Sequence, residues 1–168
     1  MLEGPHADHI PPRRNAVPGL PAKWQPRTLE DRLLLEYWNT RRGLMIAEVP
    51  IGGAGGAGRW PAGTERRRID AVRLPASASE QGILHHDQRR ATADLLASSG
   101  RIELIDVKRK LNRLVIGQVL AAQDMFERQY GIPSSRLTIV CEITGPGLEW
   151  VCRKRGIAVW SRDRQRAG

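Results

Sequence analysis

The stretch 102-IELIDVKRK-110 decides how this chain is expected to fold. Its apolar residues are of the types, often β-branched, that pack on the pleated surface of a buried sheet: Ile102, Leu104, Ile105 and Val107. Asp106 and Lys108 interrupt this strand and, being two residues apart, point to the same face. Burying a lone charge costs several kcal/mol, as an order of magnitude, unless it is paired or binds a metal. We therefore expect Asp106 and Lys108 to have a partner in common that makes their charges tolerable in a buried strand.

A second strand of the same kind is predicted at 66-RRRIDAVRL-74, where Asp70 lies among apolar residues. If the two strands pair, Asp70 and Asp106 come together at one end of the sheet. Two close carboxylates repel, so one takes a proton or a cation lies between them. Carboxylate oxygens with water completing the shell suit Mg²⁺ or Mn²⁺, and Lys108 would face a negative substrate. The alternative is an Asp106–Lys108 ion pair at a frayed strand end, satisfied by solvent.

Two predicted helices add candidates for this site. Gln118 falls near the middle of the apolar stripe of a helix over 112–130, so it either reaches the site or is a core glutamine bonded to backbone. Glu36 lies at the edge of the apolar face of a helix over 29–42 and is a further candidate metal or water ligand. Glu48, on the next strand, is a weaker rival for that role. Glu30, in the first helical turn, is explained by the helix dipole alone.

The order of the predicted helices and strands indicates one α/β domain over residues 28–160, with a mixed sheet and helices on both faces. A proline-rich extended arm precedes it at 1–27, and a frayed basic tail follows at 161–168. The glycine-rich stretch 52–63 predicts a loop, as does most of 75–99, with a short helix capped by Asp87 and ending at Leu96. The predicted elements, in order, are helix 29–42, strands 44–51, 66–74 and 101–109, helix 112–130, strand 136–144, helix 147–155 and strand 157–160.

Asp70, then Asp106-Val107-Lys108, then Gln118 on the following helix, in this order of elements, resemble the PD-(D/E)XK nuclease superfamily over roughly residues 28–160. The resemblance implies a restriction-endonuclease-like fold, αβββαβ with a C-terminal αβ unit. It implies Mg²⁺ or Mn²⁺ held by Asp70, Asp106 and Glu36, with Lys108 positioning the attacking water. The sequence departs from the family pattern at Ile69, where a proline usually precedes the first aspartate.

Composition points to the partner. The chain of 168 residues has 27 Lys and Arg against 18 Asp and Glu, a net charge of +9, and nucleic acid is the commonest polyanion that such a chain meets. We expect DNA, although phosphate recognition does not separate DNA from RNA. The basic residues expected to grip phosphates are Arg59, Arg67, Arg68, Arg109, Lys110 and Arg113.

Several other classes are disfavoured. Cys141 and Cys152 lack the spacing of a zinc site, no apolar stretch reaches the ~20 residues of a membrane span, and the N-terminus lacks a signal-peptide core. We therefore expect a cytoplasmic protein without a membrane partner. The proline-rich arm, with Trp24, is the expected contact for a second copy or another protein. A nucleic-acid-binding or assembly module with weak or no catalysis, and an RNase, remain the alternatives to a DNA nuclease.

Overall fold

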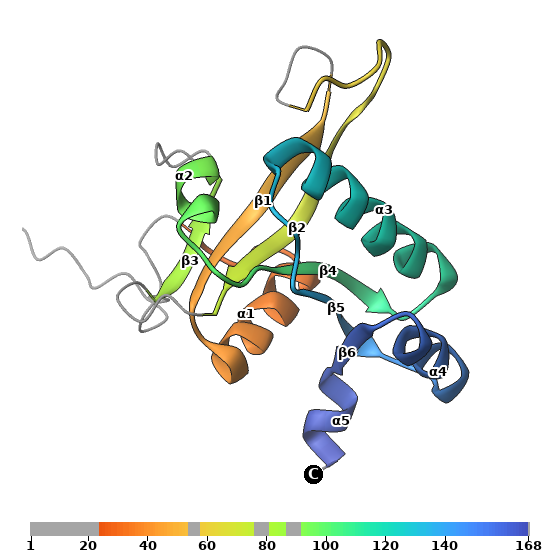
Figure 1. Ribbon diagram of the computed structural model, residues 1–168. Helices are drawn as coiled ribbons and strands as arrows, with labels where there is room; N and C mark the ends of the chain where they lie inside the picture. The colour runs from red at the N-terminus through yellow and green to blue at the C-terminus, as the bar shows by residue number, and fades with distance from the viewer. Residues whose placement is uncertain (1–23, 54–57, 76–80, 87–91, 168) are drawn as a thin grey trace, which may run out of the picture.

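The computed structural model describes residues 24–53, 58–75, 81–86 and 92–167, which form an α/β domain with helices on both faces of one mixed six-stranded sheet (Figure 1). The elements in chain order are α1 (Leu29–Arg41), β1 (Leu44–Gly52), β2 (Arg66–Leu74), β3 (Gly82–His85), α2 (Thr92–Ala97), β4 (Glu103–Lys110), α3 (Arg113–Tyr130), β5 (Arg136–Ile143), α4 (Pro146–Lys154), β6 (Ile157–Ser161) and α5 (Arg162–Ala167).

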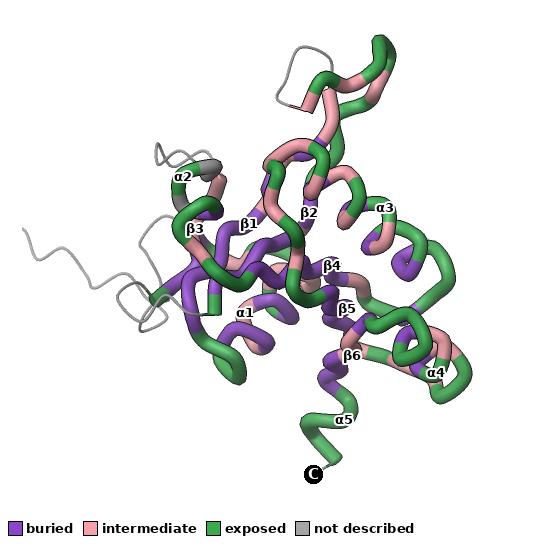
Figure 2. The backbone as a smooth tube through the Cα atoms, viewed as in Figure 1, coloured by how far each residue is buried: buried purple, intermediate pink, exposed green. Residues whose placement is uncertain are grey.

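The sheet has the order β3-β1-β2-β4-β5-β6. Its centre is antiparallel, because β2 pairs with β1 on one side and with β4 on the other. The pairs β1–β3, β4–β5 and β5–β6 are parallel, and the last two are joined by the crossover helices α3 and α4. The strands β4 and β5 each contain a run of five buried residues, 103–107 and 137–141 (Figure 2).

Helix α1 covers one face of the sheet. It begins at Thr28, whose side chain caps the amide of Asp31 while the Asp31 carboxylate accepts from the Thr28 amide, a complete capping box. Its buried side chains pack with residues of β1, β4, β5 and β6 in one apolar cluster. The indole of Trp38 donates to the carbonyl of Gly43 at 2.9 Å, which fixes the turn into β1.

Helix α3 covers the opposite face. Its side chains Val115, Ile116, Val119 and Phe126 are buried in the larger apolar cluster, with α4 completing this layer through Cys152. The helix begins at Asn112, which caps the amide of Val115, and ends at Gly131, whose left-handed backbone allows the chain to turn towards β5.

A buried ionic network ties α1 to the sheet at the start of β4. Glu103 is 1% exposed and accepts hydrogen bonds from Tyr37 at 2.6 Å, from Arg73 at 2.5 Å and from Thr138 at 2.5 Å. These donors lower the pKa of Glu103 despite its burial, while burial and the Glu103 charge raise the pKa of Tyr37 to about 12. The Glu103 carboxylate therefore stays charged and holds α1, β2 and β5 against the start of β4.

Several predictions need correction. Residues 82–85 form β3 where a loop was expected, because this segment pairs in parallel with β1. Residues 162–167 form α5 instead of a frayed tail, since Arg162 is buried and anchored to Glu36 and Glu142. Trp24 does not project towards a partner but is buried in the α1 cluster of its own chain. The rest of the predicted arm, residues 1–23, and the cap at Asp87 lie outside the described residues.

In the part of the chain that the structure describes, none of the helices combines the length and the apolarity needed to cross a bilayer.

Candidate functional site

The candidate site lies where β2 and β4 separate. Their ladder runs from Arg73–Glu103 to Ala71–Ile105 and stops there. The next position on β2 is Asp70, whose Oδ2 accepts the amide hydrogen of Val107 at 2.7 Å. The side chain of Asp70 thus takes over a hydrogen bond that the backbone of β2 no longer makes.

On its other side, Asp70 faces Glu48 of β1. The pairs Ala47–Ala71 and Val49–Ile69 flank these two residues without any offset, yet Glu48 and Asp70 do not themselves form a ladder pair. Glu48 has a left-handed backbone, with φ of 61°, which is costly for a residue with a Cβ atom.

Strand β1 changes, at Glu48, which of its side chains face α3. On β1, Ile46 faces α3 and Ala47 faces α1, whereas beyond Glu48 it is Val49 and Ile51 that face α3. A regular strand would place Ala47 and Val49 on the same face. Asp70 consequently lies between two cavities, one on each face of the sheet.

The larger cavity, of about 330 Å³, lies between the sheet and α3. Asp70, Asp106 and Lys108 line it together, so the structure brings the three predicted residues to one place. The lining also contains Ile51, Arg67, Arg68, Gln118, Ala121, Ala122 and Met125. The cavity thus has an acidic floor, an apolar wall from α3 and a basic rim.

The two aspartates are strained electrostatically. Burial raises the pKa of Asp106 to about 7, and the nearby Asp70 carboxylate adds to the rise while Lys108 opposes it. Burial likewise raises the pKa of Asp70 to about 6, against the hydrogen bond from Val107 and the charge of Lys108. Asp106 is 7% exposed, and its Oδ2 has no hydrogen-bond partner among the described residues. A buried carboxylate oxygen without a partner in a polar cavity is a place for a cation or a proton.

Glu30, which was not predicted as a site residue, lies at this site. Its Oε1 is 3.5 Å from Nζ of Lys108, and its charge contributes to the raised pKa of Asp70, as does that of Glu48. It also lines the smaller cavity, of about 140 Å³, on the α1 face, together with Glu48 and Asp70. Glu30 is the second residue of α1, and only the packing of the start of this helix over β4 could have revealed its role.

Glu36 is not brought to the aspartates. Its carboxylate receives two hydrogen bonds from Arg162, of 2.8 and 2.9 Å, and it lines neither cavity beside Asp70. Gln118 does line the larger cavity, but it is an exposed residue rather than the buried amide expected from its position in the apolar stripe.

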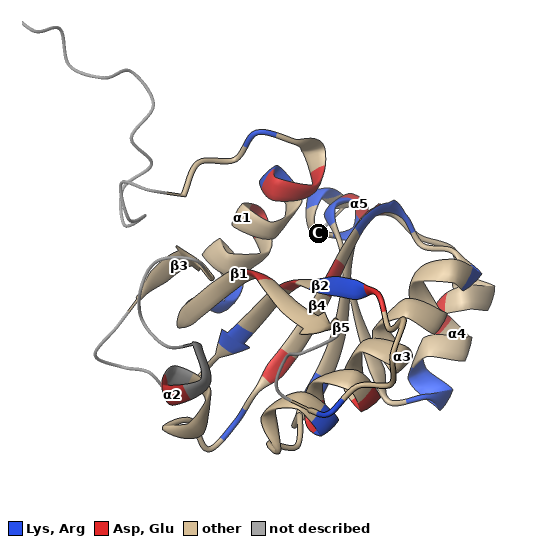
Figure 3. Ribbon diagram, turned by 90° about the horizontal axis from the view of Figure 1, so that it is seen from above, with Lys and Arg blue, Asp and Glu red and all other residues tan. Residues whose placement is uncertain are grey.

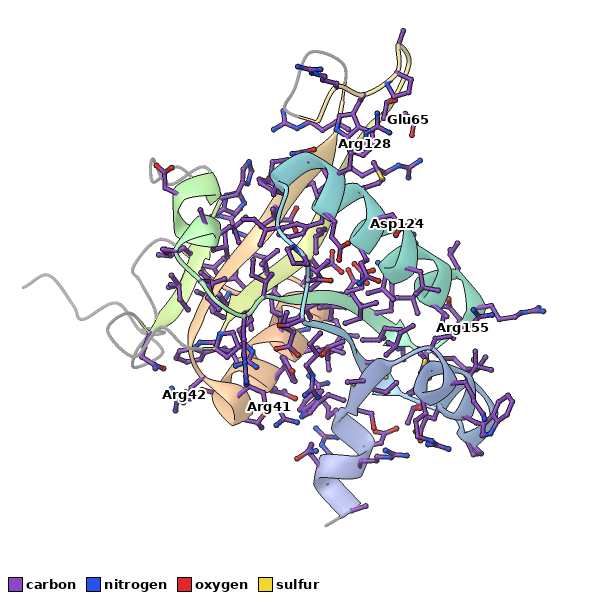
Figure 4. All side chains as sticks on the ribbon, in the orientation of Figure 1. Arg41, Arg42, Glu65, Asp124, Arg128 and Arg155 are labelled. Atoms are coloured by element: carbon purple, nitrogen blue, oxygen red, sulfur yellow. The ribbon has the colours of Figure 1, made fainter. Side chains whose placement is uncertain are left out.

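The predicted phosphate-binding residues divide into two groups. Arg67 and Arg68 line the cavity, where they pair with Glu65 at 2.7 Å and Glu48 at 3.0 Å. Arg59, Arg109, Lys110 and Arg113 are exposed and do not line it. Seen from above, both acidic and basic residues lie on the strands around the centre of the sheet (Figure 3). Figure 4 shows Arg128 of α3 beside the β1–β2 hairpin, where it donates to the carbonyls of Gly58 and Arg59.

Few carboxylates are available at this site to hold a metal ion. Within the described ranges, no three or more His, Cys, Asp or Glu residues lie close enough to hold an ion by themselves. Mg²⁺ does not require such a cage, because it is usually bound by one or two carboxylates and keeps water or phosphate oxygens as its other ligands. Asp70 and Asp106, with the unpartnered oxygen of Asp106, fit that mode of binding.

Comparison of this chain with protein-family models, with curated proteins and with solved structures finds no match.

Proposed function

We propose that this protein is a metal-dependent nuclease of the PD-(D/E)XK kind, which hydrolyses phosphodiester bonds in nucleic acid, with DNA as the expected substrate. The observation that carries this proposal is the convergence of Asp70, Asp106 and Lys108 on one cavity, at the point where two central strands part. The order α1-β1-β2-β4-α3-β5 supports a restriction-endonuclease-like fold, with β3 and α2 as an insertion between β2 and β4.

In this proposal, Asp70 and Asp106 hold Mg²⁺ or Mn²⁺. The cation, when bound, would supply Lewis-acid stabilisation of the phosphate and a water of lowered pKa. It would also offset the burial that raises the pKa of both carboxylates and the charge of Asp70 that adds to the rise at Asp106. The backbone hydrogen bond from Val107 holds the carboxylate of Asp70 in place while it does so.

Lys108 stands at the mouth of the cavity with its ammonium group paired to Glu30. Its charge would stabilise the negative charge that builds on the phosphate oxygens as water attacks and the ester oxygen leaves, a contribution of a few kcal/mol as a rough scale. Glu30 is then a positioning residue, which keeps Lys108 over the aspartates. Arg67 and Arg68 would contact flanking phosphates and orient the strand.

A binding module without catalysis is the second candidate. It is favoured by the exposed arginines Arg67 and Arg68 that line the cavity, because phosphate contact by arginine needs no metal. In that case the arginines carry the function, and the aspartates are dispensable for it.

The deciding experiment is cleavage of labelled duplex DNA, single-stranded DNA, branched DNA and RNA with Mg²⁺, Mn²⁺ or EDTA. Wild type is compared with Asp106→Asn and Lys108→Met, and with Asp124→Asn as a matched control on the exposed side of α3 (Figure 4). We expect metal-dependent cleavage that both site variants lose by about a hundred-fold or more, while the control and wild type agree. Tight binding without cleavage, equal in all four proteins, would establish the binding module instead.

A direct measurement of metal binding accompanies it. Mg²⁺ should raise the thermal stability of wild type but not that of Asp106→Asn, because the variant lacks the charge that binds the ion. This readout does not depend on having chosen the right nucleic acid.

A further inference from the structure

A third cavity, of about 130 Å³, lies beside α1 and the edge strand β6, and it shares no lining residue with the Asp70–Asp106 cavity. Three arginines from three different elements line it: Arg41 from the last turn of α1, Arg136 from the start of β5 and Arg164 from α5. None of the described residues that line it is a carboxylate. Figure 4 shows Arg41 at the end of α1, beside Arg42.

The wall of this cavity includes the indole ring of Trp160. Trp160 is 8% exposed and lines the cavity, and its indole Nε1 is buried without a hydrogen-bond partner among the described residues. The ring is fixed by an edge-on contact with Tyr37, with ring centroids 5.8 Å apart. The neighbouring hydroxyls of Tyr37 and Thr138 already donate to Glu103. Buried donors of this kind are normally paired, so the indole N–H of this lining residue is a donor still able to take an acceptor.

The arginines are only partly neutralised. Arg136 lies 3.3 Å from Glu103, a carboxylate that also pairs with Arg73, and Arg164 pairs with Glu149 of α4. Arg41 forms no ion pair with the described residues, although its carbonyl accepts a hydrogen bond from Arg73. Three arginines that line one small cavity leave an excess of positive charge there, which a bound anion would offset.

We propose that this cavity binds a single phosphate group. Its volume is well below the roughly 300 Å³ at which sites for drug-sized ligands begin, so it suits one small polyatomic anion and not a nucleoside. Guanidinium groups match phosphate oxygens through paired N–H donors, and the indole N–H of the lining residue Trp160 is a further donor. The phosphate belongs either to a nucleic-acid chain or to a free phosphorylated small molecule. This inference does not rest on the nuclease proposal, because it concerns a separate cavity and binding alone.

The test is a titration of the isotope-labelled protein with inorganic phosphate, following the assigned indole N–H resonance of Trp160 by NMR, with ionic strength held constant by chloride. We expect a saturable shift, and about five-fold weaker binding in Arg41→Gln, whose side chain holds no other element in place. Arg32→Gln, an exposed arginine on the same helix that lines none of the three cavities, serves as the control and should bind like wild type. A resonance that does not move beyond the chloride reference, or that saturates equally in Arg41→Gln, would overturn the proposal.

The source of the phosphate follows from two further probes. A short oligonucleotide that saturates the Trp160 resonance at lower concentration than inorganic phosphate would identify a nucleic-acid phosphate. An oligonucleotide that leaves the resonance in place, while inorganic phosphate still shifts it, would identify a free phosphorylated small molecule. Loss of cleavage in Asp106→Asn would bear on neither result, so the two proposals can fail separately.

Discussion

The carboxylate of Asp70 accepts the amide hydrogen of Val107 at 2.7 Å, one position beyond the last ladder pair between β2 and β4. This bond lets the two strands part without leaving the Val107 amide unsatisfied. It also directs a carboxylate to the side of Asp106, which lines the same cavity and has an oxygen without a hydrogen-bond partner among the described residues. The opening in the sheet and the acidic pair within it therefore have a common origin.

The first prediction separates the two roles of Asp70. Asp70→Asn keeps an acceptor for Val107, whereas Asp70→Ala leaves that amide without a partner, so Ala should lower the free energy of unfolding by about 1–2 kcal/mol relative to Asn. Urea denaturation at about pH 5 measures the difference. At that pH the Asp70 carboxyl of wild type is mostly protonated and therefore uncharged, as the Asn side chain is. Equal stability of the two variants would mean that water replaces the acceptor.

The second prediction concerns pH. The folded chain raises the pKa of Asp106 to about 7, well above the value of about 3.9 for an unfolded aspartate. The native state therefore binds more protons than the unfolded state in this range, and its stability falls as the pH rises from about 4 through about 7.

Removing the Asp106 carboxylate should remove its contribution to this loss of stability at higher pH. Without divalent cations, we expect Asp106→Asn to be more stable than wild type by roughly 2 kcal/mol at about pH 8, with the difference shrinking towards about pH 4. Chemical denaturation across this range provides the measurement. The exposed Asp124→Asn serves as the control, and an Asp106→Asn variant less stable than wild type at high pH would show that the carboxylate has a partner in the protein.

The third prediction tests the backbone at Glu48. At φ of 61°, a β-branched side chain is strongly disfavoured and glycine is not, so Glu48→Val should lower the free energy of unfolding by about 1–2 kcal/mol relative to Glu48→Gly. Both variants remove the ion pair with Arg68, which therefore cancels from the comparison. Thermal denaturation of the two variants is sufficient, and a more stable valine variant would mean that the left-handed turn relaxes without cost.

The central part of the site could be predicted because it follows from local rules. Strand alternation places Asp106 and Lys108 on one face, and the pairing of β2 with β4 brings Asp70 beside them. The exchange of faces at Glu48 was not predictable, since nothing in the sequence marks a glutamate for a left-handed backbone.

The misplaced elements depend on contacts distant in sequence. The basic C-terminal segment becomes α5 because Arg162 reaches Glu36, 126 residues earlier in the chain. The same bond removes Glu36 from the candidate ligands, and no helical periodicity contains that information. Glu30 was not predicted because a local rule already explains it. The helix dipole favours an acid in the first turn, so nothing further in the sequence indicated its contact with Lys108.

The last prediction distinguishes these two acids of α1. Glu30→Gln should reduce cleavage by about ten-fold while lowering the free energy of unfolding by less than ~1 kcal/mol, because its pair with Lys108 is partly exposed and its main effect is on the position of the ammonium group. Glu36→Gln should show the reverse, a loss of about 1–2 kcal/mol in stability with cleavage unchanged, because it leaves the buried guanidinium of Arg162 with Glu142 as its remaining acidic partner among the described residues. Urea denaturation and cleavage rates, measured on both variants under the same conditions, provide the comparison. Loss of cleavage in Glu36→Gln, with Glu30→Gln unaffected, would return the role to Glu36 and require α1 to move when substrate binds.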